Sequence, residues 1–253
     1  MSFEVAAGAY DAYMGRWSVP LAPAFATFAG VSAGERVLDV GCGTGALTGH
    51  LRAVLGPGAV AAVDPSGPFV EAVRARVPDV DAQTGSAEAL PFGAGAFDAA
   101  LAQLVVHFMA DPVAGVGEMA RVTRPGGRVA ACVWDHGEGS GPLAVFWRAV
   151  REGDPAADDE SGRVGTRPGD LSGVLTAAGL RDVVEDRITV EVTFADVADW
   201  WRPFTLGVGP GGTYVARLDD DARADLLARC TRLLPAGPFR LRGSAWACVG
   251  TVA

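Results

Sequence analysis

The sequence predicts one α/β domain in which helices cover both faces of a doubly wound, largely parallel sheet. Short apolar runs alternate with helical patterns five times over residues 36–134, which is typical of this fold class. The first run, Val37–Val40, stops abruptly at the glycine-rich stretch Gly41–Gly45. A length of 253 residues and a hydrophobic content of 49% suit a single core of ordinary size.

The elements of the first half follow in a regular order. Residues 1–30 read as an N-terminal helical cap, since two prolines open a helix that closes near Gly30. Strands are expected at the apolar runs 36–40, 59–63, 80–83, 97–104 and 128–134. Helices are expected near 46–55, 67–76 and 112–122. Strands joined through helices form a parallel sheet, and the crossovers between them are right-handed.

The second half is patterned less regularly. Residues 137–170 are rich in Gly, Asp and Pro and read as a loop with one helix near 143–151. Two further apolar runs, from Leu180 to Phe194 and from Phe239 to Val249, read as the last two strands. Residues 196–236 between them read as two helices joined by a glycine-rich loop, and they are a candidate lid.

Composition limits the partners that this chain can have. Thirty acidic residues against 21 Lys and Arg give a net charge of −9, which does not suit the binding of nucleic acid. The N-terminus lacks the pattern of a signal peptide, and no run approaches a membrane span, so we expect no membrane partner. The four cysteines show no paired spacing and read as free buried thiols, which favours a cytoplasmic protein.

The strand, the glycine turn and the following helix form the layout of a nucleotide-type site. Gly41 and Gly43 permit backbone angles that other residues avoid, and Gly45 lets the next helix pack close to the strand. Asp39 is a charge on a buried strand, which is costly without a partner. We therefore expect Asp39 to face a cationic or hydrogen-bonding group, such as an amino-acid ammonium.

The stretch Val37-Leu38-Asp39-Val40-Gly41-Cys42-Gly43-Thr44-Gly45 resembles motif I of the class I S-adenosylmethionine-dependent methyltransferases. Four further segments resemble motifs of that family in its order and spacing: Val60–Asp64, Gly85–Phe92, Ala96–Ala100 and Arg124–Arg128. The resemblance implies a Rossmann-like, seven-stranded sheet whose last two strands form an antiparallel hairpin, with helical cap and lid insertions. Residues 31–136 would be the cofactor-binding core of a single methyltransferase domain.

The resemblance also implies S-adenosylmethionine as cofactor and S-adenosylhomocysteine as product. Asp39 would lie near the methionine ammonium, and Asp64 would accept from both ribose hydroxyls. Ala87 would offer its amide to an adenine ring nitrogen, while Glu88 would accept from the adenine amine or begin a helix. The other implied ligand residues lie in the glycine turn and at the ends of two strands: Gly41, Cys42, Gly43, Gly45, Pro65, Ser66 and Gln103.

Residues 10–18 resemble the cap of one bacterial branch of this family. Arg16 could hold the methionine carboxylate through two parallel hydrogen bonds, or it could form an ion pair at the surface. Tyr13 could close over the sulfonium or the carboxylate of the cofactor.

Three side chains near strand ends are candidates for removing a proton from the methyl acceptor: His107, Asp135 and His136. His107 has an unperturbed pKa near neutrality, but it could instead be hydrogen-bonded between layers. Asp135 could equally cap the turn that follows it. One short cluster with Glu138 lacks the further ligands that a metal requires, so no metal site is predicted.

The resemblance implies methyl transfer to oxygen, nitrogen or carbon of a small molecule, by in-line displacement at the sulfonium methyl. All six tryptophans lie outside residues 31–133. Large rings in cap and lid would suit an apolar or aromatic acceptor, or they could simply pack the insertion onto the sheet. The closest similarity is to the broad group that contains the ubiquinone and menaquinone methyltransferases.

Two alternatives remain open. The spacing Gly41-x-Gly43-x-x-Ala46 also satisfies the dinucleotide pattern of an NAD(P)-dependent oxidoreductase, in which Asp64 would bind a ribose. A protein can also keep the methyltransferase fold and perform other chemistry or binding, because the fold does not fix the reaction.

Overall fold

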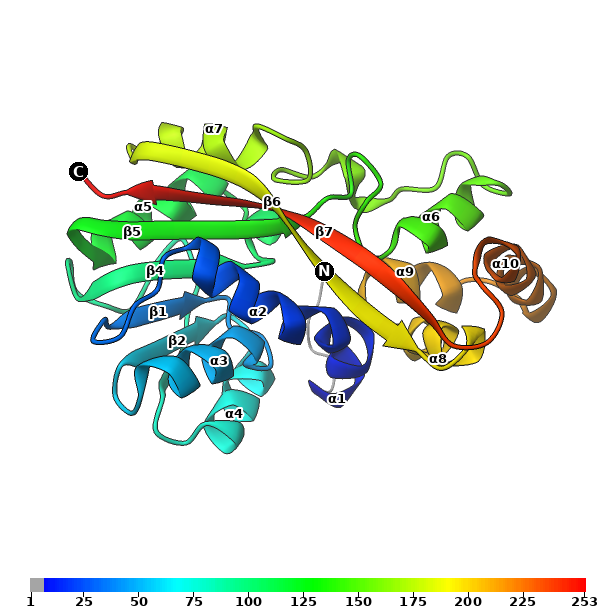
Figure 1. The fold of residues 1–253 in the computed structure, drawn as a ribbon, viewed down its shortest axis with the longest axis horizontal. Helices are drawn as coiled ribbons and strands as arrows, with labels where there is room; N and C mark the ends of the chain where they lie inside the picture. Colours follow the sequence, from blue (N-terminus) through cyan, green and yellow to red (C-terminus); the bar gives the residue numbers. More distant parts are fainter. Residues whose placement is uncertain (1–6) are drawn as a thin grey trace.

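The computed structural model describes residues 7–253, so the first six residues of the predicted cap lie outside the described part. Seven strands form one sheet in the order β3-β2-β1-β4-β5-β7-β6 (Figure 1). The strands are β1 (Val37–Val40), β2 (Val60–Asp64), β3 (Asp81–Thr84), β4 (Phe97–Gln103), β5 (Thr123–Trp134), β6 (Arg181–Phe194) and β7 (Phe239–Thr251). Strand β7 runs antiparallel to both neighbours, whereas the other pairs are parallel. The predicted fold class is therefore confirmed.

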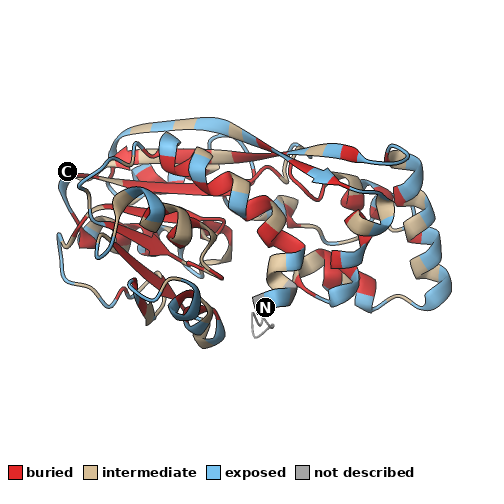
Figure 2. Ribbon diagram, turned by 60° about the horizontal axis from the view of Figure 1, so that its bottom comes forward, coloured by how far each residue is buried: buried red, intermediate tan, exposed pale blue. Residues whose placement is uncertain are grey.

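Helices cover both faces of this sheet. One face packs against α2 (Arg16–Phe28), α3 (Ala46–Leu55) and α4 (Gly67–Arg76), and the other against α5 (Pro112–Val122) and α7 (Asp170–Ala177). Successive side chains of a strand point to opposite faces, so neighbouring residues join separate cores. Figure 2 shows the central strands buried between these helices.

The long strands β6 and β7 extend beyond the rest of the sheet and carry the helical insertion at their far end (Figure 1). That insertion consists of α8 (Val197–Trp201), the 3-10 helix η4 (Arg202–Leu206), α9 (Gly209–Ala216) and α10 (Asp220–Leu233). Helix α6 (Ala144–Arg151) packs against α10. The carboxyl ends of β1 and β5 point toward this helical part (Figure 1), which is where ligands of open α/β sheets bind.

Four short elements surround the same end of the sheet. They are α1 (Ala7–Tyr10), the π-helical turn η1 (Asp11–Gly15), and the 3-10 turns η2 (Val106–Phe108) and η3 (Glu160–Gly162). Elements α1, η1 and α2 follow one another without a break, so the cap runs directly onto the sheet. No helix within residues 7–253 has the length and apolar character needed to cross a membrane.

Candidate functional site

The turn between β1 and α3 shapes the first part of the site. Gly41, Gly43 and Gly45 have φ angles of 70°, 52° and 92°, in the left-handed region that favours glycine. A Cβ atom on Gly41 would lie 2.4 Å from a methyl carbon of Val105, after β4. Backbone conformation and close packing therefore both require glycine at residue 41.

Asp64 closes the end of β2 against this turn. It is 7% exposed, and its carboxylate accepts hydrogen bonds from the amides of Gly43 at 2.9 Å and Ser66 at 2.8 Å. Burial raises the pKa of Asp64, while the two amides act in the opposite direction. The carboxylate thus links the ends of β1 and β2 beside a cavity.

This cavity, called the turn cavity here, has a volume of about 520 Å³. It is lined by residues of the cap, the glycine turn and the ends of β2 and β4: Tyr10, Gly41, Gly43, Asp64, Pro65, Phe69, Gln103, Leu104, Val105 and Phe108. A neighbouring recess of about 350 Å³ shares several of these residues and reaches down to Asp39.

Two hydrogen-bond acceptors lie in that recess. Asp39 is 1% exposed, and the Thr48 hydroxyl donates to its Oδ2 at 2.6 Å. Burial raises the pKa of Asp39 to about 7. The Gln103 amide nitrogen donates to the Ser18 carbonyl at 3.1 Å, whereas its Oε1 is buried without a hydrogen-bond partner in the described residues. The recess therefore suits a ligand group that donates hydrogen bonds.

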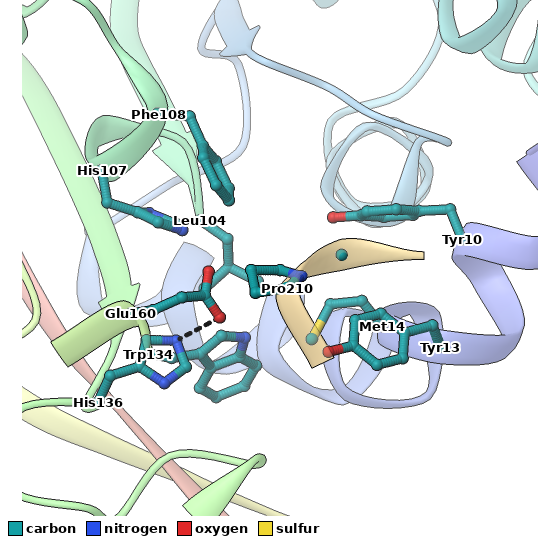
Figure 3. Close-up of a pocket in the computed structure, with 11 residues that line it drawn as sticks. Tyr10, Tyr13, Met14, Leu104, His107, Phe108, Trp134, His136, Glu160 and Pro210 are labelled. Carbon is teal, nitrogen blue, oxygen red and sulfur yellow. Dashed lines mark ion pairs between the residues drawn. The ribbon is translucent and has the colours of Figure 1, made fainter. Parts of the chain in front are cut away.

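A second cavity of about 430 Å³, called the aromatic cavity here, adjoins the first and shares Tyr10, Leu104 and Phe108 with it. Its other lining residues come from the cap, the end of β5 and two loops: Tyr13, Met14, His107, Trp134, His136, Glu160, Gly209 and Pro210. Figure 3 shows the hydroxyls of Tyr10 and Tyr13 pointing from the cap toward the side of the cavity that carries His107 and Glu160.

The glutamate and the two histidines of the aromatic cavity have strongly shifted pKa values. Glu160 is 5% exposed, and burial raises its pKa to about 7. His136 Nε2 lies 3.7 Å from Glu160 Oε2 (Figure 3), and burial lowers the pKa of His136 to about 4. Burial also lowers the pKa of His107 well below its ordinary value. Near neutral pH both imidazoles are uncharged, and Glu160 is the group that titrates.

Known proteins share this sequence pattern. A family described as "Methyltransferase domain" matches residues 38–131. An uncharacterized methyltransferase of Mycobacterium tuberculosis is 38% identical over 160 residues, which are 62% of this chain and 63% of that protein. A demethylmenaquinone methyltransferase of a Mycobacterium species is 45% identical over 103 residues, which are 41% of this chain and 43% of that protein. The chain thus spans less than two thirds of the length of these relatives.

The fold is also similar to that of solved methyltransferase structures. A putative methyltransferase from an antibiotic biosynthesis pathway of Anabaena variabilis has a similar structure, with a TM-score of 0.61 at 20% identity. The match covers 92% of this chain and 98% of that one. Residues 38–131 therefore match the methyltransferase domain family, and the whole chain has the methyltransferase Rossmann-like fold. The antiparallel β7 between β5 and β6 also distinguishes this chain from the dinucleotide-binding fold, whose strand order is 3-2-1-4-5-6.

Arg16 is held by Asp199 of α8. Its NH1 and NH2 donate to Oδ1 and Oδ2 of Asp199 at 3.0 and 2.9 Å, and its guanidinium lies 4.9 Å from the ring centre of Phe194. The contact of Arg16 with the methionine carboxylate stays a prediction. The ion pair left open by the sequence is what the structure contains.

The Glu88 side chain also forms hydrogen bonds within the protein. Its carboxylate accepts from the Ser86 hydroxyl and, at 2.9 Å, from the amide of Ala110. Ala87 packs near Gly115 of α5. Both residues lie outside the lining of the turn cavity in the described structure, and their contact with adenine stays a prediction. Glu88 instead anchors the loop after η2.

Asp135 caps a turn. Its two carboxylate oxygens accept from the Glu138 amide at 2.9 Å and from the Ser140 hydroxyl at 2.6 Å, and the residue is fully buried. These bonds match the turn-capping alternative, and a role of Asp135 in proton removal stays an untested prediction. The other two candidates, His107 and His136, do line the aromatic cavity.

Among the site residues that were not predicted, Glu160 and Asp11 are ionisable. Glu160 follows a Gly, Asp and Pro-rich loop that carries no periodic signal. Asp11 accepts from the Thr44 hydroxyl and pairs with Arg76, which ties η1 to the glycine turn. Both roles depend on contacts between segments far apart in the chain, so no local pattern reveals them.

Proposed function

We propose that this protein transfers the methyl group of S-adenosylmethionine to a small molecule, with the cofactor in the turn cavity and the acceptor in the aromatic cavity. The observation that carries the proposal is the buried carboxylate of Asp64, held against the glycine turn beside a cavity that adjoins a second one. Tyr10, Leu104 and Phe108 line both cavities, so a cofactor and an acceptor would meet along these residues.

The groups of the turn cavity fit the cofactor's chemistry. The Asp64 carboxylate would accept from the ribose hydroxyls, and each such charge-assisted bond contributes about 1.5–3 kcal/mol. The cofactor's ammonium would satisfy the unpaired Gln103 Oε1 and favour the ionised form of Asp39. When bound, the cofactor supplies a methyl group on a sulfonium, which is a good leaving group.

The protein's own contribution is alignment and exclusion of water. Orienting two reactants can lower a barrier by about 7–11 kcal/mol. The cap lies over the junction of the cavities through Tyr10, and Tyr13 packs edge-on against Phe204 of η4 with ring centres 5.7 Å apart. Aromatic walls favour an apolar or aromatic acceptor.

Isothermal titration with S-adenosylhomocysteine, NADH and NADPH tests this function. We expect the wild type to bind S-adenosylhomocysteine and Asp64→Ala to bind it about 10²- to 10⁴-fold more weakly, because two charge-assisted hydrogen bonds are lost. Asp158→Ala, which removes an exposed loop carboxylate, is the matched control and should bind like the wild type. Tight nicotinamide binding without S-adenosylhomocysteine binding would contradict the proposal, and so would binding of none of the three.

A further inference from the structure

We propose that the acceptor is an aromatic hydroxyl compound and that Glu160 is the general base that takes its proton, which makes the protein an O-methyltransferase of phenols. The inference rests on the proposed function and adds the acceptor class and the proton's destination. It is carried by the arrangement of polar atoms around the aromatic cavity.

Unpaired donors of the cavity favour an oxygen-bearing ligand. Trp134 Nε1 and the Tyr13 hydroxyl are buried and have no hydrogen-bond partner in the part of the chain that the structure describes. An indole nitrogen can only donate, so its ligand partner must offer a lone pair. An ammonium has no lone pair, whereas a phenol oxygen can receive hydrogen bonds. The same atoms therefore favour a hydroxyl acceptor over a protonated amine.

The lining favours an aromatic hydroxyl. Tyr10, Tyr13, Phe108 and Trp134 contribute rings from three separate segments of the chain. Aromatic rings pack well against one another in edge-on or offset arrangements. A single phenolic ring therefore suits the chemistry of this lining.

Glu160 is placed to receive the hydroxyl proton. Its carboxylate projects from η3 into the cavity, opposite the two tyrosine hydroxyls (Figure 3), and contacts His136 at 3.7 Å. A general base works best when its pKa lies near the operating pH. Burial gives Glu160 a pKa of about 7, while it makes His136 and His107 weaker bases than a free imidazole. The carboxylate is therefore the strongest base facing the acceptor.

The proposed reaction couples a proton transfer to a nucleophilic displacement at the methyl carbon. The acceptor's O–H bond breaks, and its proton moves to a carboxylate oxygen of Glu160. The acceptor oxygen forms a bond to the methyl carbon, and the carbon–sulfur bond breaks with its electron pair remaining on sulfur. The products are an aryl methyl ether, S-adenosylhomocysteine and a protonated Glu160 that later releases its proton to solvent.

A binding experiment tests the arrangement without catalysis. Protein saturated with S-adenosylhomocysteine is titrated with 4-nitrophenol near pH 8, and the absorption spectrum reports the ratio of bound phenol to phenolate. In the wild type, the hydroxyl donates to the anionic Glu160 and stays protonated. In Glu160→Gln the negative neighbour is gone and the donors remain, so the phenolate share should rise about tenfold or more. Glu138→Gln, a carboxylate outside the cavity, should match the wild type.

A kinetic experiment then separates a base from a structural role. With S-adenosylmethionine and a single turnover, Glu160→Gln should slow methylation of 4-methylphenol by about 10²- to 10⁴-fold. The more acidic 4-nitrophenol ionises without help, so its rate should fall much less. An equal deficit for both phenols would mean that Glu160 does not act as the base.

Several results would overturn the Glu160 assignment while leaving the proposed function intact. They are S-adenosylhomocysteine binding without 4-nitrophenol binding, identical bound spectra in the three proteins, and methylation of an aromatic amine but of neither phenol. Methylation of no acceptor by a protein that binds the cofactor product would also contradict it. Failure of the wild type to bind S-adenosylhomocysteine would instead overturn the proposed function itself.

Discussion

Burial reverses the expected order of base strength in the aromatic cavity. A free histidine is a stronger base than a free glutamate, which is why the sequence favoured His107 and His136. Burial disfavours every charged form, so it lowers the pKa of the histidines and raises that of Glu160. Residue type alone therefore did not identify Glu160 as the group that titrates near neutral pH.

The raised pKa of Glu160 predicts a pH-dependent cost to stability. A carboxyl whose folded-state pKa is raised stabilises the fold below its unfolded pKa, and this contribution is lost as pH rises through about 7. Glu160→Gln should therefore stabilise the unliganded protein at pH 8 by about 1–3 kcal/mol more than at pH 5. Denaturant unfolding at the two pH values measures this difference. An equal effect at both values would show that Glu160 is not buried in its ionised form.

Single residues also show where sequence patterns stop being informative. Asp64 ends a buried strand and accepts from the Gly43 amide of the glycine turn, while its contact with a ribose stays a prediction. Arg16 and Asp135 stand in equally suggestive stretches, and both form hydrogen bonds with protein partners, Asp199 and Ser140. The partner of a polar side chain is set by packing between distant segments, which a short motif does not record.

At the scale of elements, the glycine turn offers a matched pair of substitutions. Gly41 and Gly43 both have positive φ, but a Cβ on Gly41 would collide with Val105 at 2.4 Å, while one on Gly43 meets nothing within 4 Å. Gly43→Ala should cost about 1–2 kcal/mol of stability from backbone strain. Gly41→Ala should cost about 1–3 kcal/mol more from overpacking. Equal losses in denaturant unfolding would mean that the segment after β4 does not press on the turn.

The cap and the lid are joined by the ion pair of Arg16 in α2 with Asp199 in α8. Its side chains are 33% and 19% exposed, so Asp199→Asn should change global stability by no more than about 1 kcal/mol. Local opening of α8 should nevertheless become easier, and hydrogen exchange of residues 197–216 should accelerate. Glu191→Gln breaks the more exposed pair with Arg240 and serves as control. Unchanged exchange in Asp199→Asn would show that the pair does not fasten the lid.

At the scale of the whole molecule, a feature can be predicted from sequence when the segments that form it follow one another in the chain. The cofactor half is built from strand, turn and helix in direct succession, so its strands and the glycine turn could be predicted from sequence. The antiparallel pairing of β6 with β7 came from the family resemblance, since periodic patterns do not order strands. The aromatic cavity draws on Tyr13, Trp134, Glu160 and Pro210, which meet only in the folded chain.

The turn cavity is the feature on which the functional proposal depends, and a crystal structure with S-adenosylhomocysteine tests it most directly. We expect the ribose to lie against Asp64 and the homocysteine sulfur to face Leu104, where the two cavities adjoin. Density for the ligand in the open groove lined by Arg16, His50 and Arg76 would contradict the proposed site, and so would a turn cavity that stays empty at saturating ligand.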